Sequence, residues 1–375
     1  MRANLDTENL KAAVRDCQTA IPGKTIRPEL DCLRVWLRDC NPNDGPEPFV
    51  EATDLESGIR VTLEKYEIIE ESPYAILLPA DRLAAILATA GEQITIVADA
   101  GENIRITSEG SAYELPWIDP AAFPTVITEP DSQPIEVDTE TLHRVLATIN
   151  HAASREVARG AMAGVSLGVA TSGEIYGVAT DGRRLATVGA NHGGTASTIP
   201  LKAAQMAERL TAGKTGPCKI TTGRNWSFTV GETTIQTLLV AGRYPEYMRI
   251  LPAVADAKTV VVIAAGELCD AVKKATAIKG DMPKIKVNFL REPGPLFTGF
   301  KFKCQTETGW GQSEAKAEPE SGKNKPFELS INSKYLLEGL KSLPGSTAIR
   351  WHNHGDDKPT LITAGDYTLL IMPLT

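Results

Sequence analysis

The stretch LDTENLKAAV at residues 5–14 decides the fold, because two related stretches follow it along the chain. They are VDTETLHRVL at 137–146 and AAGELCDAVK at 264–273. Each opens with acidic residues and then spaces its apolar residues three or four positions apart, which is typical of one face of an amphipathic helix. Leu10, Leu142 and Leu268 hold the same place in the three stretches. The sequence therefore predicts a threefold internal repeat.

Each repeat continues with a second helix and then with alternating strands. The signals for the second helix lie at 79–90, 200–214 and 332–341. Two of these helices have proline in the first turn, where its missing N–H is not needed. Apolar residues that alternate along the chain predict the strands, as at Ile94, Ile96, Ile104 and Ile106. Two helices over antiparallel strands form an α+β layer.

Three similar domains follow from this pattern, each with two helices packed on antiparallel sheets. The polar EPDSQP at 129–134 is typical of a linker, and AVADAKT at 253–259 is a weaker break. The region 280–325 has less pattern, and we expect two strands there and a long surface loop near 316–326. The predicted domains are 1–127, 128–255 and 256–375.

Composition places the chain among soluble globular proteins. Of its 375 residues, 42% are hydrophobic and 23% are charged. No apolar run is long enough to span a membrane, and the N-terminus lacks a secretory pattern, so we expect a cytoplasmic protein. The net charge of −8 argues against gripping nucleic acid over the whole surface but allows contact through one face. Six cysteines form no CxxC pair, which favours buried thiols over a zinc site.

Candidate catalytic motifs are weak. Gly213-Lys214-Thr215 resembles the end of a phosphate-binding loop, but Glu208 stands where that loop needs glycine, so a turn that ends a helix is expected. His352 and His354 would share one face of a strand and could present two imidazoles to a metal, although a polar hairpin explains the same residues. No GxSxG, HExxH or GxGxxG motif occurs.

The most informative motif is VATDGRRLA at 178–186. Asp181-Gly182 is a strong signal for a tight turn, and two arginines and a leucine stand on the strand that follows. The first repeat carries a related strand end, ATDL at 52–55. A hairpin with exposed charges is the simplest interpretation of the motif taken by itself.

Together with other segments, this motif resembles the bacterial sliding clamp, the beta subunit of DNA polymerase III. The resemblance covers the whole chain, and its landmarks stand in the family's order. Besides VATDGRRLA they are ATDLESGIRV (52–61), LLPADRLAAIL (77–87), LPWIDPAAFP (115–124), GRYPEYMRILP (242–252) and the final LLIMPLT.

The resemblance implies a head-to-tail homodimer that closes into a ring, with helices inside and sheets outside. The first domain of one chain would pair its edge strand with the third domain of the other. The ring would encircle duplex DNA and tether the replicative polymerase, with the clamp loader and other proteins that carry a clamp-binding motif as further partners. It implies no catalytic residues, no cofactor, no metal and no membrane.

The resemblance also implies a pocket that binds a short partner peptide through hydrophobic anchors. Its expected residues are Met162, Thr180, Gly182, Arg183, Arg184, Leu185, Pro245, Arg249, Ile250, Asn332, Tyr335, Pro359, Leu370, Met372, Pro373 and Leu374. Apolar walls rich in methionine suit several partners, and arginines would orient polar groups of the peptide.

The inner, DNA-facing surface would carry cations from the helices and one loop. Over 5–21, 79–90, 138–150, 200–214, 266–284 and 332–341 there are 13 Lys and Arg against 11 Asp and Glu, on an acidic background. The candidates are Arg15, Arg144, Arg155, Arg159, Lys202, Arg209, Lys273, Lys274 and Lys341.

Some residues depart from the family pattern. Arg183 stands where a histidine is usual, the segment around Met162 lacks aromatic residues, and the chain ends in a short MPLT. These departures leave open a specialised clamp that serves a non-replicative or mobile-element polymerase or confers resistance to a clamp inhibitor. A metal-dependent enzyme that uses the His352 and His354 face is the alternative from another class.

Overall fold

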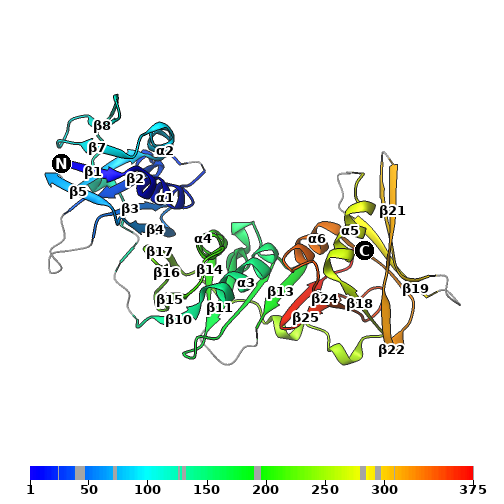
Figure 1. The fold of residues 1–375 in the computed structure, drawn as a ribbon. Helices are drawn as coiled ribbons and strands as arrows, with labels where there is room; N and C mark the ends of the chain where they lie inside the picture. The colour runs from blue at the N-terminus through cyan, green and yellow to red at the C-terminus, as the bar shows by residue number, and fades with distance from the viewer. Residues whose placement is uncertain are drawn as a thin grey trace. The chain divides into compact units, whose positions relative to one another are not determined.

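The computed structural model describes residues 1–23, 25–38, 47–70, 74–125, 127–128, 132–189, 196–278, 284–291, 297–307 and 309–374. Backbone contacts group the chain into two compact units (Figure 1). Unit 1 contains Met1–Glu140 and Gln205–Leu239, and unit 2 contains Thr141–Ala204 and Val240–Thr375. The division into three domains, with boundaries at 127 and 255, stays a prediction.

Unit 1 is built on two antiparallel sheets. The larger has eight strands in the order β10 (Ile135–Asp138), β15 (Pro217–Thr221), β16 (Asn225–Val230), β17 (Thr233–Leu238), β4 (Ser57–Thr62), β3 (Phe49–Thr53), β2 (Cys32–Trp36) and β6 (Ala75–Pro79). The smaller has five, in the order β5 (Tyr66–Glu70), β1 (Arg2–Asp6), β7 (Gln93–Val97), β8 (Ile104–Ser108) and β9 (Ser111–Leu115). Strands β4 and β17 join distant parts of the chain, with Ile59 opposite Ile235.

Unit 2 repeats this plan with a nine-stranded and a four-stranded antiparallel sheet. The larger has the order β14 (Ala196–Pro200), β11 (Gly164–Val169), β12 (Ile175–Thr180), β13 (Arg184–Val188), β26 (Tyr367–Ile371), β25 (Thr360–Ala364), β24 (Ala348–Asn353), β18 (Thr259–Ala264) and β22 (Glu318–Asn324). The smaller has the order β21 (Gly309–Lys316), β20 (Thr298–Thr306), β19 (Lys284–Arg291) and β23 (Phe327–Asn332).

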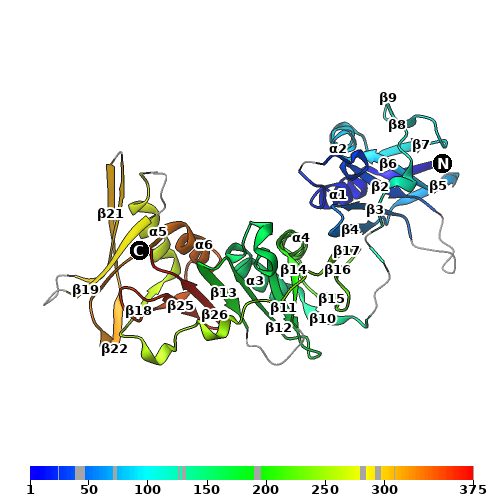
Figure 2. The same ribbon diagram turned by 180° about the vertical axis from the view of Figure 1, so that it is seen from behind.

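All six helices expected from the repeat are present. They are α1 (Thr7–Cys17), α2 (Ala80–Thr89), α3 (Thr139–Ile149), α4 (Leu201–Thr211), α5 (Ala265–Ala275) and α6 (Ser333–Lys341). Local capping explains where some of them begin: the Asp6 side chain accepts a hydrogen bond from the Asn9 N–H of α1 at 2.8 Å. Within unit 2, α3, α6 and α5 lie on one side of the nine-stranded sheet (Figures 1 and 2).

Burial follows the predicted alternation closely. Ile94, Ile96, Ile104 and Ile106, two residues apart on β7 and β8, are fully buried. In unit 2 the two sheets meet through an aromatic core, in which the rings of Phe300 and Trp351 lie 5.2 Å apart. Burying one such side chain stabilises the fold by about 2–3 kcal/mol, so this core fixes α5 and α6 against the sheets.

The expectation for 280–325 was wrong. Four strands, β19 to β22, occupy the described part of this region, and the predicted loop near 316–326 contains β22. Strand β22 pairs with β18, with Pro319 opposite Val261, as the outermost strand of the nine-stranded sheet. Its sequence, EPESGKN, lacks apolar alternation because an edge strand with a solvated face needs no buried residues. Within strands, proline is confined to edge strands, first positions and bulges, and Pro319 stands on an edge strand.

Other predictions have clear outcomes. Gly213 ends the α4 segment with φ +68°, as expected of a helix-terminating turn, and β15 follows it. Cys17, Cys32, Cys218, Cys269 and Cys304 are free, buried thiols, as predicted. Cys40, His192 and the core of the predicted linker (129–131) lie outside the described residues. Across the described residues, no helix is long and apolar enough to cross a membrane.

Candidate functional site

The turn between β12 and β13 is held by its own side chains. The Asp181 carboxylate accepts hydrogen bonds from the N–H groups of Arg183 (2.9 Å) and Arg184 (3.0 Å). The Thr180 hydroxyl donates to the Arg184 carbonyl (2.6 Å) and accepts from the Gly182 N–H (3.1 Å). Gly182 has φ +84°, a left-handed conformation that glycine adopts without strain. The TDG motif therefore sets the positions of the two arginines that follow.

Arg184 is almost fully buried, at 6% exposure, and its charge is neutralised on both sides. Its Nε donates to Asp181 at 3.1 Å, and its Nη1 donates to Glu338 of α6. The guanidinium also lies 4.3 Å from the ring centroid of Tyr335. A buried cation with two carboxylates and an aromatic ring is costly to disrupt, because each partner would lose its compensation.

Helix α6 supplies the other wall because Asn332 fixes its first turn. The Asn332 side chain accepts hydrogen bonds from the N–H groups of Lys334 (2.9 Å) and Tyr335 (3.4 Å). This cap orients the first turn, from which Tyr335 reaches Arg184. Glu338 follows one turn later and completes the ion pair.

A polar pocket of about 240 Å³ opens between the turn, α6 and the segment after α3. It is lined by Ala153, Ser154, Arg155, Glu156, Arg159, Asp181, Arg183, Arg184, Lys334, Tyr335 and Glu338. Five of these residues are cationic and three are acidic, so the pocket has an excess of positive charge. Its volume accommodates a side chain or a small anion and is below the usual size of a pocket for a drug-sized ligand.

His151 lies beside this pocket and is held neutral. Burial and then the positive charge of Arg184 lower the pKa of His151 to about 3. The imidazole therefore adds no positive charge to this wall at neutral pH, and the arginines account for it.

An apolar cluster occupies the opposite face of the same strands. Val178, Leu185, Leu361 and Leu370 form it, and Leu185 lies opposite both Thr180 and Leu370. Side chains alternate between the two faces of a sheet along a strand, so the side chains of Leu185 and Arg184 lie on opposite faces. Tyr244, Tyr247 and Leu251 pack against this buried cluster and are themselves partly buried. The apolar half and the polar half of the candidate site thus meet at the β12–β13 turn.

The last residues of the chain border this turn. The N–H of Met372 donates to the Arg183 carbonyl at 2.9 Å, and the N–H of Leu374 donates to the Ser330 carbonyl at 2.8 Å. Met372 keeps 42% of its surface exposed, and Met248 and Ile250 are also exposed. These apolar side chains add soft, adaptable contact surface next to the charged turn.

The structure brings most of the predicted pocket residues together. Those around the turn and its neighbouring strands are Thr180, Gly182, Arg183, Arg184, Leu185, Asn332, Tyr335, Leu370 and Met372. Pro245, Arg249 and Ile250 lie on the segment that carries Tyr244 and Tyr247 across the cluster, and Arg249 pairs with Glu246 at 2.9 Å. Met162 belongs to a 3-10 segment before β11, Pro359 precedes β25, and Pro373 follows Met372.

Two groups of site residues were not predicted from the sequence. Tyr244, Tyr247 and Leu251 cover the apolar cluster, and Asp181 and Glu338 hold Arg184. The i, i+3 spacing of Tyr244 and Tyr247 next to a proline is a signal for a turn that presents two rings on one side. No sequence signal links Glu338 to Arg184, because 153 residues separate them and only the pairing of β13 with β26 brings α6 near.

The predicted DNA-facing cations have different surroundings. Arg15, Arg209, Lys274 and Lys341 are exposed on their helices, and Arg155 is exposed on a loop. Arg144 forms a bidentate ion pair with Asp366 through hydrogen bonds of 2.8 and 3.0 Å, and Lys273 pairs with Asp270 at 3.0 Å. Arg159 donates to Glu156 and to the Asp181 carbonyl and so belongs to the polar pocket. Lys202 is half-buried on α4.

The two histidines proposed as a metal face have other partners. His352 is buried and its Nε2 lies 2.9 Å from the Thr363 hydroxyl, while His354 Nε2 lies 3.0 Å from the Ala253 carbonyl. Burial lowers the pKa of His352 to about 4. Within the described ranges no group of three or more His, Cys, Asp or Glu is placed to hold a metal ion. The metal-enzyme alternative therefore gains no support from this geometry.

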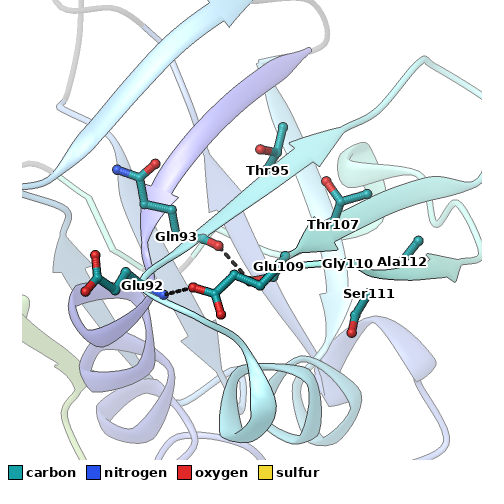
Figure 3. Close-up of a pocket in the computed structure, with 9 residues that line it drawn as sticks. Glu92, Gln93, Thr95, Thr107, Glu109, Gly110, Ser111 and Ala112 are labelled. Atoms are coloured by element: carbon teal, nitrogen blue, oxygen red, sulfur yellow. Dashed lines mark hydrogen bonds between the residues drawn. The ribbon is translucent and has the colours of Figure 1, made fainter.

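A second hollow, of about 600 Å³, lies at the β8–β9 hairpin of unit 1 (Figure 3). The Glu109 side chain folds back over Gly91, and its carboxylate accepts a hydrogen bond from the Glu92 N–H at 3.4 Å. Its remaining walls are mostly Thr, Ser and backbone. The hollow flanks β9, the open edge of the five-stranded sheet.

Comparison with known proteins identifies what this fold resembles. Residues 136–246 match the family model described as "DNA polymerase III beta subunit, central domain". The chain is 26% identical over 248 residues to the beta sliding clamp of Caulobacter vibrioides, with 64% of each chain covered. It is 24% identical over 377 residues to that of Staphylococcus epidermidis, with 96% of each covered. The chain thus spans about two thirds of the first relative and nearly all of the second.

Solved structures show the same fold over the entire chain. The DNA polymerase sliding clamp of Bacillus subtilis superposes with a TM-score of 0.87 at 20% identity, covering 100% of this chain and 99% of that one. The DNA polymerase III subunit beta of Pseudomonas aeruginosa gives 0.84 at 21%, covering 100% of both. The resemblance predicted from the sequence is confirmed, and so is the α+β clamp fold.

Proposed function

We propose that this chain is a DNA polymerase processivity factor, a homodimeric ring that encircles duplex DNA and slides along it. It carries no active site of its own and tethers the replicative polymerase and other partners through the pocket at the β12–β13 turn. The observation that carries the proposal is the clamp fold over the full chain, with the landmark motifs at the positions described above.

Ring closure needs two open sheet edges, and the chain has suitable ones. Strand β9 ends the five-stranded sheet, and strand β21 ends the four-stranded sheet. An edge strand presents unpaired N–H and C=O groups, which a second strand satisfies. Pairing β9 of one chain with β21 of another, and the reverse, gives a closed head-to-tail dimer in which both edges are covered.

The pocket at the β12–β13 turn suits a short peptide with apolar and polar parts. The exposed side chains of Met372, Met248 and Ile250 would receive apolar anchors. The buried cluster of Leu185 and Leu370 lies at the same turn and supports this surface. The arginines of the turn would orient the polar part. A peptide of this size should bind with a Kd on the order of 1 μM, because ordering it offsets much of the burial.

Weak, sequence-independent attraction to DNA would come from the helices. The exposed cations Arg15, Arg209, Lys274 and Lys341 are separated by acids, including Glu8, Glu208 and Glu267 near the same helices. Scattered cations of this kind neutralise few phosphates, so the ring is attracted to the duplex without being fixed on it. The proposed site of action is the cytoplasm, and the three domains predicted from the repeat are the proposed ring segments.

A specialised clamp is the second candidate, and Arg183 favours it. The backbone of Arg183 is part of the turn, while its side chain lines the polar pocket where the family usually has histidine. A permanent charge at this position would select a different set of partner peptides.

Retention on circular DNA tests the topological function. The chain is loaded by its clamp loader onto a nicked circular plasmid and passed through gel filtration in high salt. We expect co-elution with the circle and loss of the protein after a restriction enzyme linearises it, because a ring slides off an end. Equal loss from circular and linear DNA would contradict the encircling ring.

A further inference from the structure

Two arginines of the polar pocket have no assigned acceptor. Arg155 and Arg183 are both lining residues, and the guanidinium of neither has a hydrogen bond or ion pair with another described residue. Both side chains belong to exposed residues, so each is free to turn toward a bound group. Two planar cations that face one small space form a natural receptor for an anion.

The carboxylates of the same pocket are already engaged. Asp181 accepts hydrogen bonds from two backbone N–H groups and forms an ion pair with Arg184. Glu338 also pairs with Arg184, and Glu156 pairs with Arg159. Lys334 lies 4.0 Å from Glu338. The acids of the pocket are thus matched by Arg184, Arg159 and Lys334, and the charge of Arg155 and Arg183 remains without a counter-ion.

We propose that Arg155 and Arg183 bind the carboxylate of an aspartate or glutamate in the partner peptide, next to its apolar anchors. The inference rests on the proposed peptide-binding function and specifies which peptides this chain selects. The guanidinium fork matches a carboxylate with paired hydrogen bonds, a fit that an uncharged amide does not reproduce.

The surroundings favour an acidic peptide over DNA. A duplex needs a continuous basic surface, whereas three carboxylates are interleaved with the cations here. The pocket also shares its turn with the exposed Met372, which offers a peptide an apolar contact and offers DNA nothing. The volume of about 240 Å³ admits one acidic side chain.

An internal acidic side chain fits better than a peptide C-terminus. Apolar surface continues on the other side of the turn through Met372, so a peptide that extends across the turn places an internal residue beside the arginines. A chain that continues past the arginines can present a side chain to them, but its terminus lies elsewhere.

Fluorescence anisotropy with matched peptides tests this inference. The probes are fluorescein-labelled, C-terminally amidated nonapeptides with a Leu and a Phe as apolar anchors and one glutamate, scanned over the preceding positions. Each has a twin with glutamine in place of the glutamate. The proteins are the full chain, its Arg155→Gln/Arg183→Gln variant, and an Arg82→Gln/Arg105→Gln variant, which removes equal charge from exposed positions of unit 1.

At one or more positions, we expect the glutamate peptide to bind the full chain roughly fivefold more tightly than its twin at low salt. This preference should persist in the Arg82/Arg105 variant and fall below twofold in the Arg155/Arg183 variant. Equal binding of both twins at all positions would overturn the inference while leaving the peptide pocket intact. Failure of every peptide to bind would instead count against the proposed function.

Two further binding measurements distinguish the alternatives. Binding of a labelled DNA duplex tests whether the arginines bind DNA, and binding of peptides with a free C-terminus tests whether they bind a terminal carboxylate. If the Arg155/Arg183 variant loses duplex affinity relative to the full chain and keeps the glutamate preference, the arginines serve DNA and the inference is wrong. Peptides with a free C-terminal carboxylate and no glutamate should bind no better than the amidated glutamine twins. A clear gain with them would assign the pocket to a chain end.

Discussion

Leu55 and Gly182 occupy the same position in two copies of one turn. Their φ angles are +81° and +84°. In the first copy the Thr53 hydroxyl donates to the Ser57 carbonyl (2.9 Å) and accepts from the Leu55 N–H (3.0 Å). Asp54 accepts from the Ser57 N–H at 2.8 Å, as Asp181 does from that of Arg184. The first copy of the turn therefore has a leucine in the left-handed conformation, where the second copy has a glycine.

This difference predicts opposite responses to exchange at the two positions. Leu55→Gly should raise the free energy of unfolding by about 0.5–1 kcal/mol, because the left-handed strain is relieved and the Leu55 side chain is exposed. Gly182→Ala should lower it by about 1 kcal/mol, since an added Cβ would meet only Arg159 Nη1, at an ordinary contact distance of 3.5 Å, and the backbone strain is the main penalty. Urea unfolding of both variants measures the change. A loss of stability in Leu55→Gly would mean that leucine packing outweighs the strain.

The Arg184 network predicts a recoverable loss of stability. Arg184→Met should destabilise the chain by about 3 kcal/mol, because the partly buried carboxylates of Asp181 and Glu338 would lose their shared guanidinium partner. Adding Glu338→Gln should restore part of that loss, since it removes one of the unpaired carboxylates. A double-mutant cycle on the free energy of unfolding measures the coupling. Strictly additive losses would show that the ion pair contributes nothing beyond packing.

Protonation of buried histidine predicts weaker folding in mild acid. Burial and the charge of Arg184 lower the pKa of His151 from 6.5 to about 3. Below pH 6.5, therefore, the His151 imidazole binds a proton in the unfolded chain but stays neutral in the folded chain. Stability is therefore complete above pH 6.5 and falls as the pH drops toward 3. The loss from His151 between pH 7.5 and pH 5 should be about 2 kcal/mol.

Urea unfolding at the two pH values measures this loss, with His151→Gln as the comparison. The variant should show a pH dependence smaller by most of that amount, whatever its stability at pH 7.5. His352, whose pKa is lowered to about 4, acts with the same sign and accounts for part of what remains. An unchanged pH dependence in His151→Gln would contradict the assignment to this residue.

Blocking the β9 edge should open the ring. In the two-residue hairpin at Glu109-Gly110, the N–H groups of alternate β9 residues, including Ala112, point away from β8. Ala112→Pro removes one outward donor and leaves the pairing with β8 intact, so the dimer should dissociate to monomers at micromolar concentration. Ala112→Thr keeps the donor and serves as the control. Sedimentation velocity that finds Ala112→Pro still dimeric would place the interface elsewhere.

Neighbouring cations in unit 2 should differ in their contribution to DNA attraction. Lys274→Ala and Lys341→Ala should each reduce the slope of log affinity against log salt by roughly one, if each contacts a phosphate. Arg144→Ala should reduce it less, because its guanidinium is already bound to Asp366. Anisotropy of a labelled duplex over a salt series measures all three. An Arg144→Ala effect as large as those of the lysines would show that DNA displaces Asp366.

Local pattern was enough to predict all six helices, the buried alternating strands and the thiols. Such features depend on residues that are close in sequence, as with Asp6 at the start of α1 or the isoleucines of β7 and β8. Strand β22 was missed because an edge strand is defined by its neighbour, here β18, and not by its own apolar residues. The clamp resemblance came from motifs at turns, where backbone conformation restricts the choice of residue most strongly.

The candidate site was predictable to a lesser degree. Gly182 and Arg184 follow from the turn motif, but the partners of Arg184 come from α6, which only the β13–β26 pairing brings near. Arg159 was assigned to the DNA-facing set, although its side chain contacts the turn through the Asp181 carbonyl. Long-range pairing and side-chain direction decide such cases, and neither is encoded in a single segment.

The pairing of β4 with β17 has a consequence for synthesis of the chain. Residues 57–62 emerge from the ribosome about 170 residues before their partners at 233–238, which at 5–20 residues per second takes about 10–30 s. During that time β4 presents an unpaired edge to its surroundings. A nascent chain in this state is a natural client for a ribosome-bound chaperone, and slowing translation between these two strands would prolong its exposure to aggregation.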